Sequence, residues 1–428
     1  MKACKSIYQK KSCLLPFSIS TLISGLLFIP FISACSGVSK PHITNNPVAD
    51  NPSSQSFRDA TGLLPIKKLS IAQANFLLAD QDSLSDLAIL NKSKLKLYIL
   101  LSQGGKGFLK KIPAGQWTQN NKEKINFFAA ADLNSDGGDD LILILGDSEN
   151  PKTQILFNNK KGYFYSKEEG RYSLRLGIEK VIPVDLDGDG DRDLFYFGNM
   201  IKPPAKKNHQ TMVWINKGDG SFENLTSLLM PALPAGIRDA SFADYNGDGV
   251  IDIFLAYGKG QNKLLINNGV GKFSDRTSSS IPRILDDSMH ADWADFDQDG
   301  DNDILVVNRS IHKKYRRYSG ETNYFLENKG GGIFRKRSHR TLPRFPSQKV
   351  YLFDGNGNNH PDALILTTKG VYYLQGYGKW QFSDETIRRL PRFRKFDQMI
   401  FGDINQDKFL DLFGWSRQAG RLWLNRFD

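Results

Sequence analysis

The sequence predicts an all-β fold made of seven similar units of about 50 residues, and three observations lead to this prediction. An acidic loop recurs along the chain at intervals of 49 to 59 residues. Short apolar segments flank the loops at regular distances, and no helical spacing of apolar residues lies between them. Glycine (38) and phenylalanine (28) are abundant in the 428 residues, a composition that suits short strands and turns better than long helices.

Six copies of the acidic loop share one nine-residue pattern. Asp stands at positions 1 and 9, Asp or Asn at position 3 and position 5, and usually Gly at position 6. The backbone carbonyl of position 7 is a further expected ligand, since its side chain varies freely. The residues expected to bind metal are Asp132, Asn134, Asp136, Gly138, Asp140, Asp185, Asp187, Asp189, Asp191, Asp193, Asp244, Asn246, Asp248, Val250, Asp252, Asp295, Asp297, Asp299, Asp301, Asp303, Asp354, Asn356, Asn358, His360, Asp362, Asp403, Asn405, Asp407, Phe409 and Asp411. A seventh, degenerate copy with Asp80, Asp82 and Asp86 has Leu78 at position 1, so metal binding there is left open.

The spacing of oxygen ligands in these loops favours Ca²⁺, which takes six to eight of them. Without a cation, three or four carboxylates so close together would repel each other strongly. The EF-hand pattern does not apply, because it requires Glu at position 12, where this chain has residues such as Leu143, Tyr196 and Leu255. The alternative is a set of Asn- and Asp-rich turns without metal. We expect up to six structural Ca²⁺ sites, with occupancy of the loops at 354 and 403 left open.

The segments after each loop predict the remaining strands of its unit. In the unit that begins at Asp244, Ile253–Ala256 predicts a second strand, Leu264–Asn268 predicts a third, and Gly271–Phe273 opens a fourth. Four strands per period of about 50 residues, repeated around a central axis, are typical of β-propeller blades. The sequence therefore predicts a propeller of four-stranded blades.

The two ends of the chain predict that this propeller is closed. The last unit stops after its third strand, and Phe57–Thr61 matches the fourth-strand segment Phe273–Thr277. We expect the N-terminal strand to complete the last blade, which would leave no free sheet edge. The prediction is a single seven-bladed β-propeller over residues 57–428.

These acidic loops and their flanking strands resemble the VCBS/FG-GAP repeat family, which includes the seven-bladed propeller of integrin α chains. The resemblance covers nearly all of the predicted folded region, from residue 57 onward. It implies a seven-bladed propeller with calcium-binding loops. Some proteins with similar propellers are polysaccharide lyases, so the fold alone does not fix the function.

The N-terminal residues have the features of an export signal. Residues 1–13 hold four lysines and no acidic residue, and residues 14–34 are uncharged and largely apolar. The sequence Ile32–Cys35 resembles a bacterial lipobox, which implies that residues 1–34 are a lipoprotein signal peptide and that Cys35 is lipidated. The alternative is an uncleaved transmembrane helix.

Residues 35–56 predict a lipid-linked tether in a bacterial cell envelope. This stretch is rich in Ser, Asn and Pro and has little to bury, which is typical of a flexible linker. Because Ser36 rather than Asp follows the cysteine, the expected location is the outer membrane. All three cysteines lie within the first 35 residues, so a disulfide scaffold in the folded part is excluded.

Three acid-free segments, residues 308–320, 335–348 and 386–396, each contain five lysines or arginines. Strand order predicts that they lie on the face opposite the acidic loops. We expect a docking surface for an envelope protein or an anionic glycan or lipid, and export makes nucleic acid an unexpected partner. The alternative is a solvated surface that balances the acidic loops. The expected docking residues are Arg309, Lys313, Lys314, Arg316, Arg317, Arg335, Lys336, Arg337, Arg340, Arg344, Arg388, Arg389, Arg392, Arg394 and Lys395.

The sequence offers little that indicates catalysis. Its six histidines lack metal-ligand spacing, and it has no nucleophile elbow or phosphate-binding loop. His290 directly precedes an innermost strand, and a structural role is expected for it. We expect a monomeric, non-enzymatic binding or scaffold module, and the alternative is a carbohydrate-active propeller, either a lectin or a polysaccharide lyase.

Overall fold

The computed structural model describes residues 57–65, 70–94, 96–104, 106–109, 112–113, 123–146, 150–167, 171–175, 177–198, 211–309, 323–390, 396–416 and 420–425. The predicted signal peptide, the lipidation site Cys35 and the tether lie outside these residues. Within the described ranges every helix is a single turn, and none has the length and apolarity needed to cross a bilayer.

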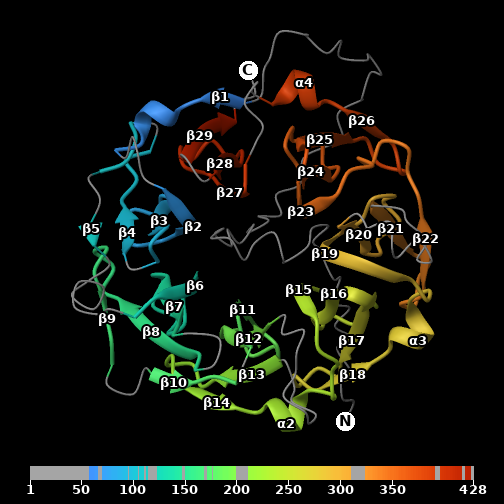
Figure 1. Ribbon diagram of the computed structural model, residues 1–428, viewed down its shortest axis with the longest axis horizontal. Coiled ribbons are helices and arrows are strands. Elements are labelled where there is room, and N and C mark those ends of the chain that lie inside the picture. Colours follow the sequence, from blue (N-terminus) through green and yellow to red (C-terminus); the bar gives the residue numbers. More distant parts are fainter. Residues whose placement is uncertain are drawn as a thin grey trace, which may run out of the picture.

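The described chain is built from short antiparallel strands that pair in the order in which they occur (Figure 1). Five of the acidic-loop repeats contribute four strands each, the second contributes five, and the last contributes three. The sets surround a common centre, with the first strand of each repeat innermost and the last at the rim (Figure 1). The all-β, propeller-like architecture that the repeats predict is therefore confirmed.

The first and third units follow this strand order. The second unit differs, because the residues expected to form its fourth strand are split into two short strands that both pair with β8. The strands are β2 (Ile71–Leu77), β3 (Asp86–Asn91), β4 (Leu97–Leu100) and β5 (Ile112–Pro113), then β6 (Ile125–Ala131), β7 (Asp140–Leu145), β8 (Lys152–Asn158), β9 (Phe164–Tyr165) and β10 (Arg171–Ser173), then β11 (Lys180–Val184), β12 (Asp193–Phe197), β13 (Thr211–Asn216) and β14 (Phe222–Asn224).

The fourth and fifth units share one continuous sheet, because the long strand β16 extends past its own partners and pairs with β19. The sixth unit is again a separate four-stranded sheet. The strands are β15 (Ile237–Ala243), β16 (Asp252–Gln261), β17 (Lys263–Asn267) and β18 (Phe273–Asp275), then β19 (Leu285–Ala294), β20 (Asp303–Asn308), β21 (Asn323–Asn328) and β22 (Phe334–Arg337), then β23 (Ser347–Phe353), β24 (Asp362–Thr367), β25 (Gly370–Gly376) and β26 (Phe382–Asp384).

The C-terminal sheet contains both ends of the described chain. It consists of β27 (Gln398–Gly402), β28 (Asp411–Trp415), β29 (Gly420–Asn425) and the N-terminal strand β1 (Phe57–Asp59). β1 runs antiparallel to β29, with Phe57 opposite Asn425 and Asp59 opposite Trp423. The N-terminal strand thus supplies the fourth strand of the last unit, as the sequence match predicts.

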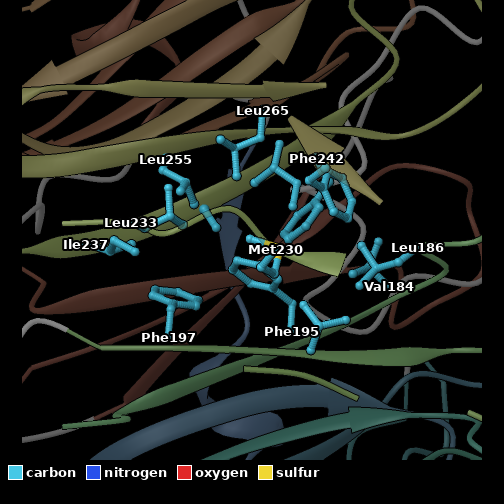
Figure 2. Packing of buried hydrophobic residues seen from close by; sticks show 14 of the residues in the cluster. Val184, Leu186, Phe195, Phe197, Met230, Leu233, Ile237, Phe242, Leu255 and Leu265 are labelled. Atoms are coloured by element: carbon cyan, nitrogen blue, oxygen red, sulfur yellow. The ribbon is translucent and has the colours of Figure 1, made fainter. Parts of the chain in front are cut away.

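The hydrophobic core lies between adjacent units. Figure 2 shows one such cluster, in which Phe195 and Val184 of the third unit face Phe242 and Leu255 of the fourth. The rings of Phe195 and Phe242 meet edge to face, with their centroids 5.4 Å apart. Because alternate residues of a strand face opposite sides, each sheet buries apolar residues against both of its neighbours.

Three units end in a single helical turn that the sequence analysis did not predict. These turns are α2 (Thr226–Leu229), α3 (Thr277–Ser280) and α4 (Thr386–Arg389), and a 3-10 turn, η2 (Thr61–Leu63), follows β1. In each helix the first residue is a buried Thr whose hydroxyl accepts a backbone N–H of the third strand, over 2.9–3.1 Å. This bond fixes the outermost strand to its neighbour.

Candidate metal-binding loops

The acidic loops join the first and second strands of their units and lie beside the turns between third and fourth strands. The side-chain amide of Asn216, at the end of β13, donates to the backbone oxygen of Leu133 in the loop of the preceding unit, over 2.8 Å. Asn267 donates in the same way to Leu186, over 2.7 Å. The loops and these turns therefore share one face, as strand order predicts.

The Asp at position 9 of each loop has a structural role that sequence reasoning missed. One of its oxygens accepts the backbone N–H of position 2, and the other accepts the backbone N–H of the residue that ends the third strand, or in the first unit that of Ser102, just after the strand. Each of these carboxylates is completely buried. The residues that make this pair of bonds are Asp86, Asp140, Asp193, Asp252, Asp303, Asp362 and Asp411.

The degenerate first unit separates this structural role from metal binding. Asp86 accepts the N–H of Ala79 over 2.8 Å and that of Ser102 over 2.7 Å, although position 1 of its loop is Leu78. The position-9 Asp is thus kept where the loop lacks its first ligand. Burial raises the pKa of Asp86 to about 7.

A second repeated residue links neighbouring units. The Asn that ends the third strand donates its side-chain amide to a backbone oxygen of the preceding loop, at 2.7–3.2 Å. The acceptor is position 2 of the loop in four cases and Leu78, at position 1, for Asn158. The sequence shows this Asn in five units, with Ser102 and Gly376 in its place in the first and sixth, but only the fold shows that it links two units. The residues are Asn158, Asn216, Asn267, Asn328 and Asn425.

Two loops bring three carboxylates together. In the third unit Asp185, Asp187 and Asp193 each offer an oxygen, and these oxygens lie within 4.8 Å of one another. In the fifth unit Asp295, Asp297 and Asp303 do the same. Both triads combine positions 1, 3 and 9 of the loop, and each could hold a metal ion.

The fifth-unit loop contains an oxygen that fits a cation. Oδ2 of Asp297 accepts the indole N–H of Trp380 over 2.8 Å. Its Oδ1 is buried and has no hydrogen-bond partner within the described residues. Burial and the charge of Asp299 raise the pKa of Asp297. A bound cation would supply the missing partner of Oδ1 and offset the repulsion.

The backbone of each loop is held by its own side chains. Both oxygens of Asp185 accept loop N–H groups, from Gly188 over 2.8 Å and from Gly190 over 3.1 Å. At position 7, the N–H of Asp191 is bound by Asp189 over 2.9 Å. These bonds shape the loop, and they occur equally in Asx turns that bind no metal.

The loops at 244, 354 and 403 gather fewer carboxylates. At position 3, Asn246 and Asn405 direct their amide N–H groups toward the position-5 carboxylates, Asp248 over 3.0 Å and Asp407 over 2.9 Å. In the sixth unit Asn358 donates to the backbone oxygen of Gly376 over 3.1 Å. Within the described part of the chain these three loops form no acidic triad.

The described basic residues are split between internal contacts and the surface. Arg335 on β22 donates to the buried carboxylate of Glu327 over 2.8 Å, and Arg337 and Lys329 also pair with it, at 3.4 Å and 3.1 Å. Arg389 is itself buried and donates to Gln375 over 2.9 Å. Since a buried guanidinium cannot meet a partner, Arg389 does not belong to a docking surface, which corrects the sequence prediction.

The remaining predicted docking residues have different positions. Arg335, Lys336 and Arg337 lie on the rim strand β22 rather than on the face opposite the loops. Arg340 and Arg344, both exposed, lie in the connection to β23, at the end of the unit opposite the acidic loop. Exposed Arg309 follows β20, and Arg388 pairs with Glu385 at 3.6 Å. Lys313, Lys314, Arg316, Arg317, Arg392, Arg394 and Lys395 lie outside the described residues.

His290 lies in a group of charged side chains between the innermost strands. Its Nε2 is 3.0 Å from Oδ2 of Asp239 on β15, and Nζ of Lys180 on β11 is 3.6 Å from Oδ1 of the same carboxylate. Burial lowers the pKa of His290 to about 4, although Asp239 opposes this shift. The imidazole is therefore neutral at pH 7 and links two units, which fits the structural role expected for it.

Comparison with known proteins agrees with the repeats. Residues 132–196, 205–255 and 244–306 match the model of the FG-GAP-like repeat family. A T-cell immunomodulatory protein homolog of Plasmodium yoelii yoelii is 26% identical over 239 residues, which are 48% of this chain and 33% of that protein. The aligned stretch thus spans about a third of that relative.

Two solved structures have a similar fold. One is an Agrocybe aegerita lectin that recognises non-reducing terminal N-acetylglucosamine, with a TM-score of 0.52 and 16% identity, covering 82% of this chain and 87% of the lectin. The other is BBS1N, solved in complex with ARL6DN, with a TM-score of 0.52 and 11% identity, covering 87% of this chain and 98% of BBS1N. At these identities the likeness concerns the fold alone.

Proposed function

For this chain, which belongs with the FG-GAP-like repeat proteins, we propose a calcium-stabilised seven-bladed propeller that acts as a non-enzymatic binding module. The pairing of β1 with β29 supports a closed ring. Calcium stiffens the loop face, and the module presents the opposite face and the rim to a partner.

The pair of acidic triads carries the calcium part of this proposal. Three carboxylate oxygens within 4.8 Å, in a loop that also offers backbone carbonyls, form the start of a hard-oxygen site. The buried, unpartnered Oδ1 of Asp297 supports the same reading for the fifth unit. Asp185, Asp187 and Asp193 would hold one ion, and Asp295, Asp297 and Asp303 another. The ion would supply charge neutralisation and no chemistry.

Lipid anchoring in a bacterial envelope remains part of the proposal. Its support is the sequence: four lysines, an uncharged apolar run and the lipobox-like Ile32–Cys35. Replacing Cys35 by Ser should release the protein from membranes or leave it unprocessed. Unchanged processing and membrane fractionation of that variant would remove this part.

The partner part of the proposal rests on exposed cations at the end of the units opposite the loops. Arg340 and Arg344 are exposed there. Such side chains favour an anionic surface, in a protein or an acidic glycan, and speed its association. A carbohydrate-binding role is the second candidate, favoured by the fold it shares with a lectin of known sugar specificity.

The calcium proposal is tested by thermal unfolding with and without a chelator. Ca²⁺ binding to the folded state alone raises the melting temperature, and chelation should lower it. Asp187→Ala and Asp297→Ala should each reduce this difference, whereas Asp219→Ala, an exposed turn residue of the third unit, should not. The calcium proposal fails if wild type melts identically in both buffers and retains no Ca²⁺ after dialysis.

A further inference from the structure

The loop of the second unit, residues 132–140, differs from the two triad loops in what lies against it. The ammonium of Lys160 donates a hydrogen bond to the backbone oxygen of Asp136, and its Nζ is 3.7 Å from Oδ1 of the same residue. Asp136 occupies position 5 of the loop. A positive charge from the protein itself is therefore already in place where the sequence predicts a metal ion.

Lys160 reaches the loop because of its place in the turn between third and fourth strands. Its N–H is bound by the side chain of Asn158, two residues earlier, over 2.8 Å. Gly218 and Gly330 have the same bond to Asn216 and Asn328, over 3.1 Å each. The three residues are thus structurally equivalent.

This position faces the acidic loop of its own unit. A Cβ built on Gly218 would lie 2.9 Å from Oδ2 of Asp191, and one on Gly330 would lie 3.6 Å from Oδ2 of Asp301. Both aspartates stand at position 7 of a triad loop. A side chain at this position therefore projects onto position 7, and in the triad loops it is missing because the residue is Gly.

The second unit differs at both ends of this contact. Position 7 is Gly138, and a Cβ built there would lie 3.1 Å from Cγ of Lys160, so the missing side chain makes room for the lysine stem. Gly218 and Gly330 have φ of +87° and +82°, and Lys160 adopts φ +58°, a conformation that costs a residue with a Cβ more than glycine. Lys160 therefore adopts a conformation that suits glycine, and its ammonium contacts Asp136.

We propose that the Lys160 ammonium is a built-in cation for the loop at residues 132–140, which consequently binds no Ca²⁺. The loop keeps its shape and its charge balance at any calcium concentration, whereas the loops with glycine at this position depend on the ion. This inference rests on the proposed calcium function of the third and fifth units.

The test counts bound Ca²⁺ by equilibrium dialysis. Lys160→Gly restores the residue found in the triad units and removes the ammonium, so it should bind one more Ca²⁺ per chain than wild type. Adding Asp136→Ala to Lys160→Gly should remove that ion again. Lys161→Gly, the exposed neighbour in the same turn, should bind the same number as wild type.

A second measurement, of melting temperature, tests the inference even if Lys160→Gly folds poorly. Lys160→Met keeps the side-chain stem and loses the charge, so in chelator it should melt at a lower temperature than Lys161→Met. Equal Ca²⁺ counts for wild type and folded Lys160→Gly, or equal melting of the two Met variants, would overturn the inference. The Ca²⁺ bound by Asp187→Ala is counted in the same experiment. If this variant binds as many ions as wild type, the proposed calcium function of the third unit fails, independently of the result for Lys160.

Discussion

The backbone N–H of Leu422 donates to the hydroxyl of Thr61 over 3.2 Å, a bond between residues 361 positions apart. The same bond joins Val213 to Thr226 and Leu264 to Thr277 within single units. The N-terminal segment therefore repeats, beside β29, the contact that ends other units. It is bound both by strand pairing and by this threonine.

Removing the Thr61 hydroxyl should weaken the junction of the two ends. Thr61→Val keeps the shape and leaves the Leu422 N–H without its acceptor, so the free energy of unfolding should fall by about 1 kcal/mol. Thr61→Ser should retain most of the bond. Urea denaturation measures both, and Thr226→Val, at a fully buried site, should cost more. Equal stability of the Val and Ser variants at residue 61 would mean that this contact does not hold the ends together.

The position-9 aspartates predict a loss of stability that calcium does not change. Asp86→Ala leaves two buried N–H groups, those of Ala79 and Ser102, without acceptors, and should cost about 2–5 kcal/mol. Because Leu78 replaces the first ligand of this loop, the loss should be the same in Ca²⁺ and in chelator. Asp82→Ala, exposed in the same loop, should cost less than about 1 kcal/mol. A loss for Asp86→Ala that appears only in Ca²⁺ would assign this residue to a metal site instead.

The sequence was sufficient for the unit, its strand order and the closing strand, because period-two alternation and the acidic loop repeat locally. It was not sufficient to separate the roles within the loop. Asp193 and Asp187 look alike in sequence, yet Asp193 is buried with both oxygens on backbone N–H groups and Asp187 is partly exposed. Only the contacts of Asp193 with the backbone of its own loop and with the end of β13 distinguish the two residues.

The basic residues show the same limit. Arg335 and Arg340 belong to one acid-free run, but Arg335 pairs with Glu327, which precedes it by eight residues across a hairpin. The run of residues 335–348 contains no acidic residue, but antiparallel pairing of β21 with β22 places Glu327 directly opposite Arg335. Lys160 escaped notice because its partner Asp136 lies 24 residues earlier.

The lowered pKa of His290 predicts that the free energy of unfolding falls in acid. Its pKa is about 4 in the folded protein and near 6.5 when unfolded, so as the pH falls through this window the unfolded chain takes up a proton that the folded chain does not. Its share of stability is therefore complete above pH 6.5 and is lost toward pH 4, by up to about 3 kcal/mol.

Replacing His290 by Asn should flatten this part of the stability profile. The groups that act on its charge are Asp239 from β15, Lys180 from β11 and Lys349 from β23, and all three remain in the variant. The measurement is the free energy of unfolding at pH 7 and pH 5 for both proteins. The difference between the two pH values should be smaller in His290→Asn, and an identical difference would show that the imidazole ionises normally.

Exposed charges opposite the loops should govern binding and leave folding nearly unchanged. Reversing Arg340 and Arg344 to Glu should keep stability within about 1 kcal/mol, since exposed charges contribute little to folding. The same change should weaken retention on an immobilised polyanion, most clearly at low salt, where screening is weak.

The matched control reverses Lys161 and Lys272, exposed lysines in turns on the loop face, with the same change in net charge. Retention that falls equally in both variants would reflect net charge alone, whereas a selective loss for Arg340 and Arg344 would place the anionic partner opposite the acidic loops. Arg335 and Arg337 are left in place, because removing them would expose the buried charge of Glu327 and confuse binding with folding.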